Sequence, residues 1–251
     1  MKHFLILSLI LFTACVNNNE PKGNNTTQKH LPNDISIRML NGDIKTVTET
    51  LFFDVEQVDS DWIPDSTDHL VITYQYNQAG FMTQKTITSI DSLGNPDVTE
   101  TKYEFENGLP VKGSLYKNNE MLQYTTVKEI DPKTIEHTKY KANDEAFIKE
   151  RYELNAKYRE SKKSVYSINN GKERLNVVET NNYHKDSMHY QIEKNVYDDN
   201  GVPFDMKAYD DVLILNKDNV GNPLSIVTLS HLPNHTEVFM KTMSTFTYEY
   251  Y

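Results

Sequence analysis

Four aspartates surround the single tryptophan of the chain, and such a cluster could bind a metal ion. They flank Trp62, in the longest stretch that lacks an alternating strand pattern, and are Asp59, Asp61, Asp65 and Asp68. Calcium prefers carboxylate ligands, but this stretch has no glycine to form the tight bend of an EF-hand loop. We therefore interpret it as a solvated loop and predict no metal site.

Trp62 itself supports two interpretations. It closes one end of the core as an aromatic plug, or it forms a platform on which a ligand stacks. The plug is favoured because buried aromatic rings mostly pack against their own protein. Trp62 nevertheless stays a candidate ligand contact.

Other residue types that carry chemistry show no catalytic pattern. Among the 8 histidines, His231 and His235 have a ligand-like spacing, but Pro233 between them prevents the helix that would bring both imidazoles together. The chain has no Gly-x-Ser-x-Gly elbow and no phosphate-binding loop. No acid/base pair stands out among the 36 acidic residues. We predict a non-enzymatic protein that needs no cofactor.

Cys15 is the single cysteine, and it follows Thr13-Ala14 at the end of an apolar run over residues 4–12. A basic start, a short apolar run and small residues before a cleavage point are typical of a secretory signal. The run is roughly half as long as a membrane-spanning helix, so we predict a cleaved signal peptide at 1–14. The alternative to a modified cysteine is a plain secretory signal followed by an incidental thiol.

The junction before Cys15 resembles the lipobox of bacterial lipoproteins, in which the cysteine becomes the acylated first residue. It departs from that pattern at Phe12, where leucine is usual. The resemblance implies that Cys15 carries the lipid, with palmitate as a typical acyl chain, and that this lipid attaches the protein to a membrane.

Three triplets resemble the Asp-Ser/Thr acceptor for O-glycosylation in exported proteins of Bacteroidota. They are Asp65-Ser66-Thr67, Asp91-Ser92-Leu93 and Asp186-Ser187-Met188. The resemblance implies that Ser66, Ser92 and Ser187 are candidate glycosylation sites.

Composition separates a tether from a folded domain. Residues 16–34 are rich in Asn, Lys, Thr, Gln and Pro, and such a segment cannot bury enough apolar surface to offset the entropy of ordering. We expect the lipidated cysteine and a flexible tether at 15–34, and one domain at 35–251. The net charge of −10 disfavours nucleic acid and anionic lipid head groups as partners of that domain.

The elements of the domain are predicted from period-two alternation. Residues 70–76, 99–105 and 246–250 place aromatic or β-branched side chains at every second position, which is typical of strands. Gly80 and Gly108 belong to a series of turn residues spaced about thirteen apart, and glycine tolerates the positive φ that tight hairpins require. The spacing predicts an antiparallel meander of about fourteen strands. Residues 143–158 also fit an amphipathic helix, but we favour strands there.

A repeated unit supports this interpretation. It occurs as Tyr74-Gln-Tyr76-Asn77-Gln-Ala-Gly80, as Tyr103-Glu-Phe105-Glu-Asn107-Gly108 and as Tyr197-Asp198-Asp199-Asn200-Gly201. These units resemble the degenerate YD (Rhs-type) repeats of lipoproteins of Bacteroidota. The resemblance covers residues 38–230 and implies β-hairpins in a long sheet, with no enzymatic activity.

We therefore expect an all-β fold, a long antiparallel meander that forms a curved sheet, a sandwich or a half-open barrel. A membrane-spanning barrel is the alternative, because the chain ends in the aromatic segment 246–251. Residues 149–163 argue against it, since they place charges on both faces of any strand and a lipid-facing wall would not tolerate them.

For function, we expect a lipid-anchored protein of the cell envelope, held at the outer membrane and either periplasmic or surface-exposed. Its β domain would bind or scaffold a protein or glycan partner. Two alternatives stay open: a carrier or sensor of an apolar ligand, and a glycan-active enzyme with two carboxylates facing each other across a cleft.

Overall fold

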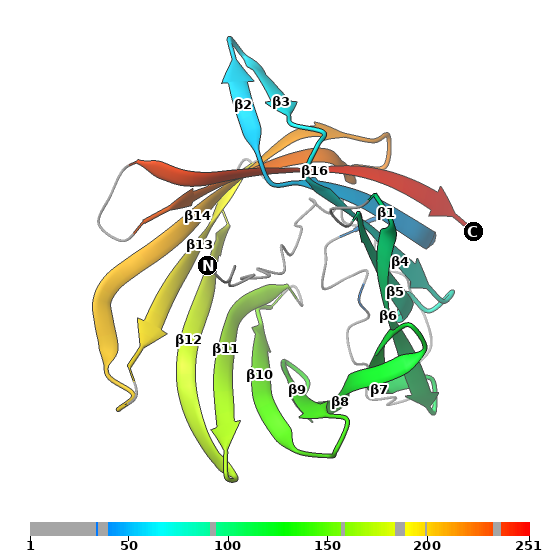
Figure 1. Ribbon diagram of the computed structural model, residues 1–251, viewed down its shortest axis with the longest axis vertical. Helices are drawn as coiled ribbons and strands as arrows, with labels where there is room; N and C mark the ends of the chain where they lie inside the picture. Colours follow the sequence, from blue (N-terminus) through cyan, green and yellow to red (C-terminus); the bar gives the residue numbers. More distant parts are fainter. Residues whose placement is uncertain are drawn as a thin grey trace.

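Fourteen strands pair into one antiparallel sheet that closes on itself as a barrel (Figure 1). The computed structural model describes residues 34, 40–90, 94–156, 159–183, 189–198, 200–232 and 237–251. Strands make up 76% of the structure, so the predicted all-β meander is confirmed. The strands are β1 (Ile44–Phe52), β2 (Val55–Val58), β3 (Asp61–Pro64), β4 (His69–Tyr76), β5 (Met82–Ile90), β6 (Pro96–Glu106), β7 (Leu109–Lys117), β8 (Glu120–Asp131), β9 (Thr134–Lys141), β10 (Ala146–Leu154), β11 (Glu160–Asn169), β12 (Lys172–Tyr183), β13 (His189–Tyr197), β14 (Pro203–Lys217), β15 (Pro223–His231) and β16 (Val238–Tyr250).

The barrel closes between the first and the last strand of the chain. β1 pairs with β16 on one side and with β4 on the other, so that Glu49 lies opposite both Phe246 and Ile72. From β4 to β16, each strand pairs with the next strand in sequence. The sequence left open whether the sheet closes, and this long-range pair is the feature that closes it.

Two of the three repeated units, those that end at Gly80 and Gly201, contain an Asx-x-x-Gly segment that forms a hydrogen-bonded turn, whereas Asn107 and Gly108 form a turn of adjacent residues with positive φ. In the turn between β4 and β5, the side-chain oxygen of Asn77 accepts from the backbone N–H groups of Ala79 and Phe81, each at 3.0 Å. The N–H of Gly80 donates to the Asn77 carbonyl at 2.8 Å, and Gly80 has a φ of 81°. Asp198 and Asp218 form the same pattern in later turns. An Asn or Asp at the first position and a Gly at the fourth are therefore required by the turn.

Residues 143–158 contain a strand, which confirms the favoured interpretation; the helix is wrong. β10 pairs with β9 and β11 along its whole length. Asn143 does not cap a helix; its side-chain oxygen accepts from the N–H of Glu145, at 3.3 Å, in the turn before the strand. Alternate residues of β10 find partners on opposite faces of the sheet, which a helix could not provide.

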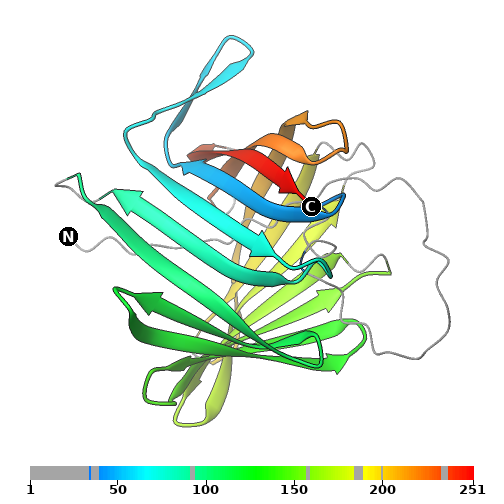
Figure 2. The same cartoon turned by 90° about the vertical axis from the view of Figure 1, so that its right-hand side faces the viewer.

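Two apolar clusters lie on opposite faces of the wall. The larger cluster faces the interior and draws on β1, β4, β14, β15 and β16, with members such as Val47, Ile72, Val212 and Phe246. The smaller cluster lies outside, where Val55 of the β2–β3 hairpin packs on Val227 and Met243. Figures 1 and 2 show this hairpin projecting from the barrel wall.

No helix in the described ranges is long and apolar enough to cross a membrane.

Candidate functional site

Inner and outer faces of the wall can be followed around the barrel through the strand pairs. Val47 belongs to the interior cluster, its cross-strand partner is Tyr74, and the next partner is Lys85. Partners followed in the same way through β6–β9 place His137 on this inner face. Glu150 lies opposite His137 and therefore also faces inward. Because side chains alternate between faces, Glu150 points inward while Lys149 and Arg151 point outward. The wall of β10 therefore carries charges on both sides, as the sequence predicted.

On the outer face, the charges form ion pairs between neighbouring strands. Arg151 donates to Glu136 at 3.0 Å, and the ammonium of Lys149 lies 3.4 Å from Glu136 and 2.5 Å from Glu173. Further outer pairs join Glu100 to Lys102, Glu104 to Lys112 and Glu153 to Lys162. A wall in contact with lipid tails would carry an apolar band at this position. The described outer wall of β6–β12 carries these ion pairs among aromatic side chains such as Tyr124 and Tyr140.

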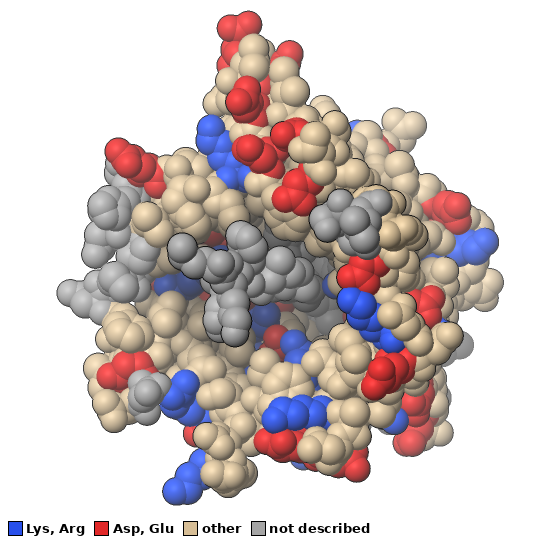
Figure 3. Space-filling model, in the orientation of Figure 1, with Lys and Arg blue, Asp and Glu red and all other residues tan. Residues whose placement is uncertain are grey.

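On the inner face, acids and lysines alternate across six strands. We call this set the charge belt: Lys139, Glu150, Lys163, Glu179, Lys194 and Asp210. Glu150 lies 3.0 Å from Lys139 and 3.6 Å from Lys163, and Lys163 lies 3.8 Å from Glu179. Lys194 faces Glu179 in the next strand pair and forms an ion pair with Asp210. Figure 3 shows Lys, Arg, Asp and Glu atoms on the wall of the hollow at the centre of the barrel.

Two central members of the belt, Glu150 and Lys163, have pKa values that favour their charged forms despite burial. Burial opposes ionisation of Glu150, but the ammonium groups of Lys163 and Lys139 outweigh it and lower its pKa to about 2. Burial also opposes the charge of Lys163, whose pKa is nevertheless raised by Glu150 and Glu179. Two neutral groups adjoin them. Burial lowers the pKa of His137 to about 4, and burial raises the pKa of Tyr152, whose hydroxyl donates to Glu150 at 3.0 Å.

One acid beside the belt behaves differently. Glu160 begins β11, is 3% exposed and has its pKa raised to about 7, mainly by burial. The side chain of Asn181 donates to its Oε1 at 3.4 Å and to its backbone carbonyl at 3.1 Å, and Tyr183 donates to the same carbonyl at 2.5 Å. Its Oε2 is buried and has no hydrogen-bond partner in the described structure.

The opposite inner wall is mainly apolar, with one polar group at its centre. Glu49 accepts from the hydroxyl of Tyr74 at 2.9 Å and from that of Ser244 at 2.7 Å, so three strands share one buried carboxylate. The interior is therefore charged along β9–β14 and apolar along β1, β4 and β14–β16.

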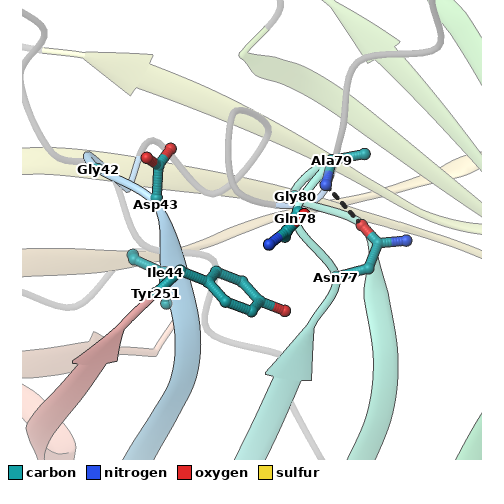
Figure 4. A pocket seen from close by; sticks show the side chains of 8 residues that line it. All are labelled: Gly42, Asp43, Ile44, Asn77, Gln78, Ala79, Gly80 and Tyr251. Atoms are coloured by element: carbon teal, nitrogen blue, oxygen red, sulfur yellow. Dashed lines mark hydrogen bonds between the residues drawn. The ribbon is translucent and has the colours of Figure 1, made fainter.

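A small open pocket of about 80 Å³ lies where the barrel closes (Figure 4). Its lining comes from the start of β1, the turn after β4 and the C-terminal Tyr251. Tyr251 donates its hydroxyl to the carbonyl of Tyr76, and its N–H donates to the carbonyl of Asp43 at 2.9 Å. The pocket lacks charged groups other than Asp43 among its lining residues, so we interpret it as part of the closing seam.

The residues singled out from the sequence lie apart from the belt. Trp62 packs in the outer cluster on the hairpin, with the ammonium of Lys241 6.0 Å from its ring centroid, so it does not close an end of the main core. Ser66 is exposed in the turn between β3 and β4. Cys15, Ser92 and Ser187 lie outside the described residues.

The metal candidates do not converge either. His231 stacks on Tyr209 with ring centroids 4.3 Å apart, and its Nε2 lies 3.2 Å from Asp211, while His235 is outside the described residues. Asp65 accepts from the N–H of Thr67 at 2.8 Å in a local turn. In the described part of the chain, no three His, Cys, Asp or Glu side chains are arranged to hold a metal ion.

The charge belt could not be recognised from the sequence. Its members are spread from residue 139 to residue 210, and no spacing within one strand distinguishes them. The available signal was that charged residues occupy both odd and even positions within 149–163. Which of the two sets faces inward is known only once the strands are paired.

The fold and site define a closed 14-stranded antiparallel β-barrel with a partly charged interior. The solved structures that are similar to it include two porin-like proteins. That of Bacteroides uniformis ATCC 8492 is 12% identical over 83% of this chain and 98% of its own, with a TM-score of 0.48. That of Bacteroides vulgatus ATCC 8482 is 11% identical over 83% and 99%, with a TM-score of 0.40. No protein-family model and no curated protein matches the chain.

Proposed function

We propose that this protein is a lipid-anchored barrel of the cell envelope that acts as a binding module for a hydrophilic partner. Its lipid would sit on Cys15, and its barrel would stand in water beside the outer membrane, on the periplasmic or the surface side. The anchor rests on the resemblance around Cys15, and the aqueous position of the barrel rests on the charged outer wall.

The observation that carries this proposal is the presence of ion pairs on both faces of β10. An ion pair such as Glu136–Arg151 on an outer wall would have to be desolvated in a bilayer, and charged residues facing lipid are costly there. In water the same pairs are solvated at little cost. The distribution of charge therefore favours a water-exposed barrel.

Chain length supports a tether between lipid and barrel. Leu40 packs in the interior cluster, and Asp34 accepts from the N–H of Met82 at 2.7 Å, so the chain reaches the barrel at the end where β1 begins. Fully extended, residues 16–33 could span at most about 60 Å. We infer that this end of the barrel faces the membrane.

The charge belt supports a polar partner. Its buried lysines and acids satisfy one another, and a polar ligand can exchange hydrogen bonds with them without desolvating an apolar surface. The apolar half of the interior favours a second candidate, a carrier of an apolar ligand. Native mass spectrometry of the purified protein distinguishes the two. The binding module predicts no stoichiometric lipid, and a retained lipid would favour the carrier.

The anchor is tested by growing cells on an alkyne analogue of palmitate and comparing the wild type with Cys15→Ala. We expect label on the wild type alone, and mass spectrometry should show a mature chain that begins at acylated Cys15. A mature chain that begins at unmodified Val16 would contradict the anchor.

A further inference from the structure

Glu160 is a buried acid that the charge belt does not neutralise. The nearest cation of the belt, Lys163, is already shared between Glu150 and Glu179. No described basic side chain forms a salt bridge with Glu160, and its Oε2 is left without a hydrogen-bond partner in the described structure. Burying a carboxyl oxygen in this way costs free energy that a bound group could recover.

The surroundings of Glu160 include two tyrosine rings. Tyr183, whose hydroxyl donates to the Glu160 carbonyl, has its ring centroid 5.8 Å from that of Tyr190, with the rings tilted by 39°. Both rings belong to the inner wall, and Asn181 adds a side-chain amide beside the carboxyl group. Aromatic faces attract cations, and a carboxylate supplies the opposite charge.

Glu160 lies near one end of the barrel, although its side chain is buried in the described structure. It follows the turn between β10 and β11, at the end of the barrel where β1 begins and β16 ends. Glu160 lies closer to this end than Glu150 and Lys163, which lie further along the same wall.

From this geometry we propose that Glu160, Tyr183 and Tyr190 form a binding site for an organic ammonium group inside the barrel. This inference rests on the proposed function as a binding module and names the ligand class. The carboxylate of Glu160 would pair with the cation, and the tyrosine rings would contact its alkyl groups.

Protonation should compete with the ligand. Burial raises the pKa of Glu160 to about 7; Lys163 opposes the rise, and the charges of Glu179 and Glu150 add to it. Arg159, the residue before Glu160, acts on Tyr183 as a further nearby charge. The ionised fraction of a group with a pKa near 7 rises roughly tenfold between pH 6 and pH 8. An alkylammonium stays charged over this range, so its affinity should rise with pH by about the same factor.

The test uses choline and its uncharged isostere 3,3-dimethylbutan-1-ol as probes, titrated calorimetrically into the purified protein. We expect choline to bind roughly tenfold more tightly at pH 8 than at pH 6, and at least about tenfold more tightly than the isostere at pH 8. Glu160→Gln should abolish the preference for choline. Glu153→Gln, which changes an exposed acid of the outer wall, should leave it unchanged.

Equal binding of both probes, or choline binding that survives Glu160→Gln, would overturn the inference. The pH comparison needs no variant and decides the matter if Glu160→Gln does not fold. If choline does not bind but neutral sugars do, the ammonium site is wrong and the binding module stands. If neither binds, the ammonium site is contradicted, and so is a small sugar as the partner of the binding module.

Discussion

Lys149 and Glu150 are consecutive residues, yet they form ion pairs on opposite sides of the barrel wall. Lys149 contacts Glu136 and Glu173 outside, whereas Glu150 contacts Lys139 and Lys163 inside. The same strand thus carries ion pairs on both of its faces. The proposed position of the barrel in water follows from this arrangement, because a lipid-facing wall would carry an apolar band.

Glu150→Gln should destabilise the protein by on the order of 3 kcal/mol, because it removes the carboxylate that pairs with the buried ammonium group of Lys163 and the partly exposed one of Lys139. The matched control is Glu153→Gln on the outer face of the same strand. Its side chain is 44% exposed and forms an ion pair with Lys162, so the cost should stay below about 1 kcal/mol. Urea denaturation measures both, and equal losses would contradict the inner position of Glu150.

The pH dependence of stability should reveal Glu160. Its pKa is raised from 4.5 to about 7 in the folded protein, so its contribution is fully present below pH 4.5 and is lost as pH rises through 7. Glu160→Gln removes this loss. Between pH 5 and pH 8.5, the variant should therefore gain about 3 kcal/mol relative to the wild type.

The comparison is made by urea denaturation at each pH. The pKa of His137 is lowered to about 4, so its contribution to stability is lost in the opposite direction, as pH falls from 6.5. This contribution is the same in the wild type and the variant. Parallel curves for wild type and variant would show that Glu160 is not buried as described.

Gly113→Ala should destabilise the barrel by about 1–2 kcal/mol, because the new methyl group would lie 2.9 Å from the ring of Tyr103 on the neighbouring strand. Combining it with Tyr103→Ala should recover part of this loss. Thermal unfolding measures the cycle, and additive losses in the double variant would refute the contact.

Gly108→Val should destabilise the barrel by a similar free energy, but for a different reason. Gly108 has a φ of 80° and open space around it, so the strain comes from the backbone and not from a neighbour. Gly108→Asn should be tolerated better, since asparagine adopts this conformation more readily. Val and Asn variants that melt together would contradict the tight turn.

Much of the fold could be predicted from local patterns. The alternation in residues 70–76 and the turn at Gly80 depend on neighbours in sequence, and both are found in the structure. Closure could not be predicted in this way, because Glu49 meets Phe246 through pairing at long range. The resemblance to YD repeats stays a prediction, although the Asx-x-x-Gly turn explains why such units recur.

The candidate site was less predictable than the fold. Asp65 and Trp62 attracted attention because they are clustered or rare, whereas Glu160 is one acid among 36. Its distinguishing property is burial beside Lys163 and Glu179, which arises only when β11 and β12 are paired. Sequence spacing carries no signal of that kind.

The behaviour of the barrel without its lipid tests its proposed position in water. The Cys15→Ala protein, produced without residues 1–14, should remain in solution without detergent and show a strand-rich circular dichroism spectrum. It should also stay in the supernatant when sedimented with phosphatidylcholine vesicles. A protein that needs detergent to stay dissolved, or that inserts into the vesicles and resists proteolysis there, would show a membrane-spanning wall and contradict the account.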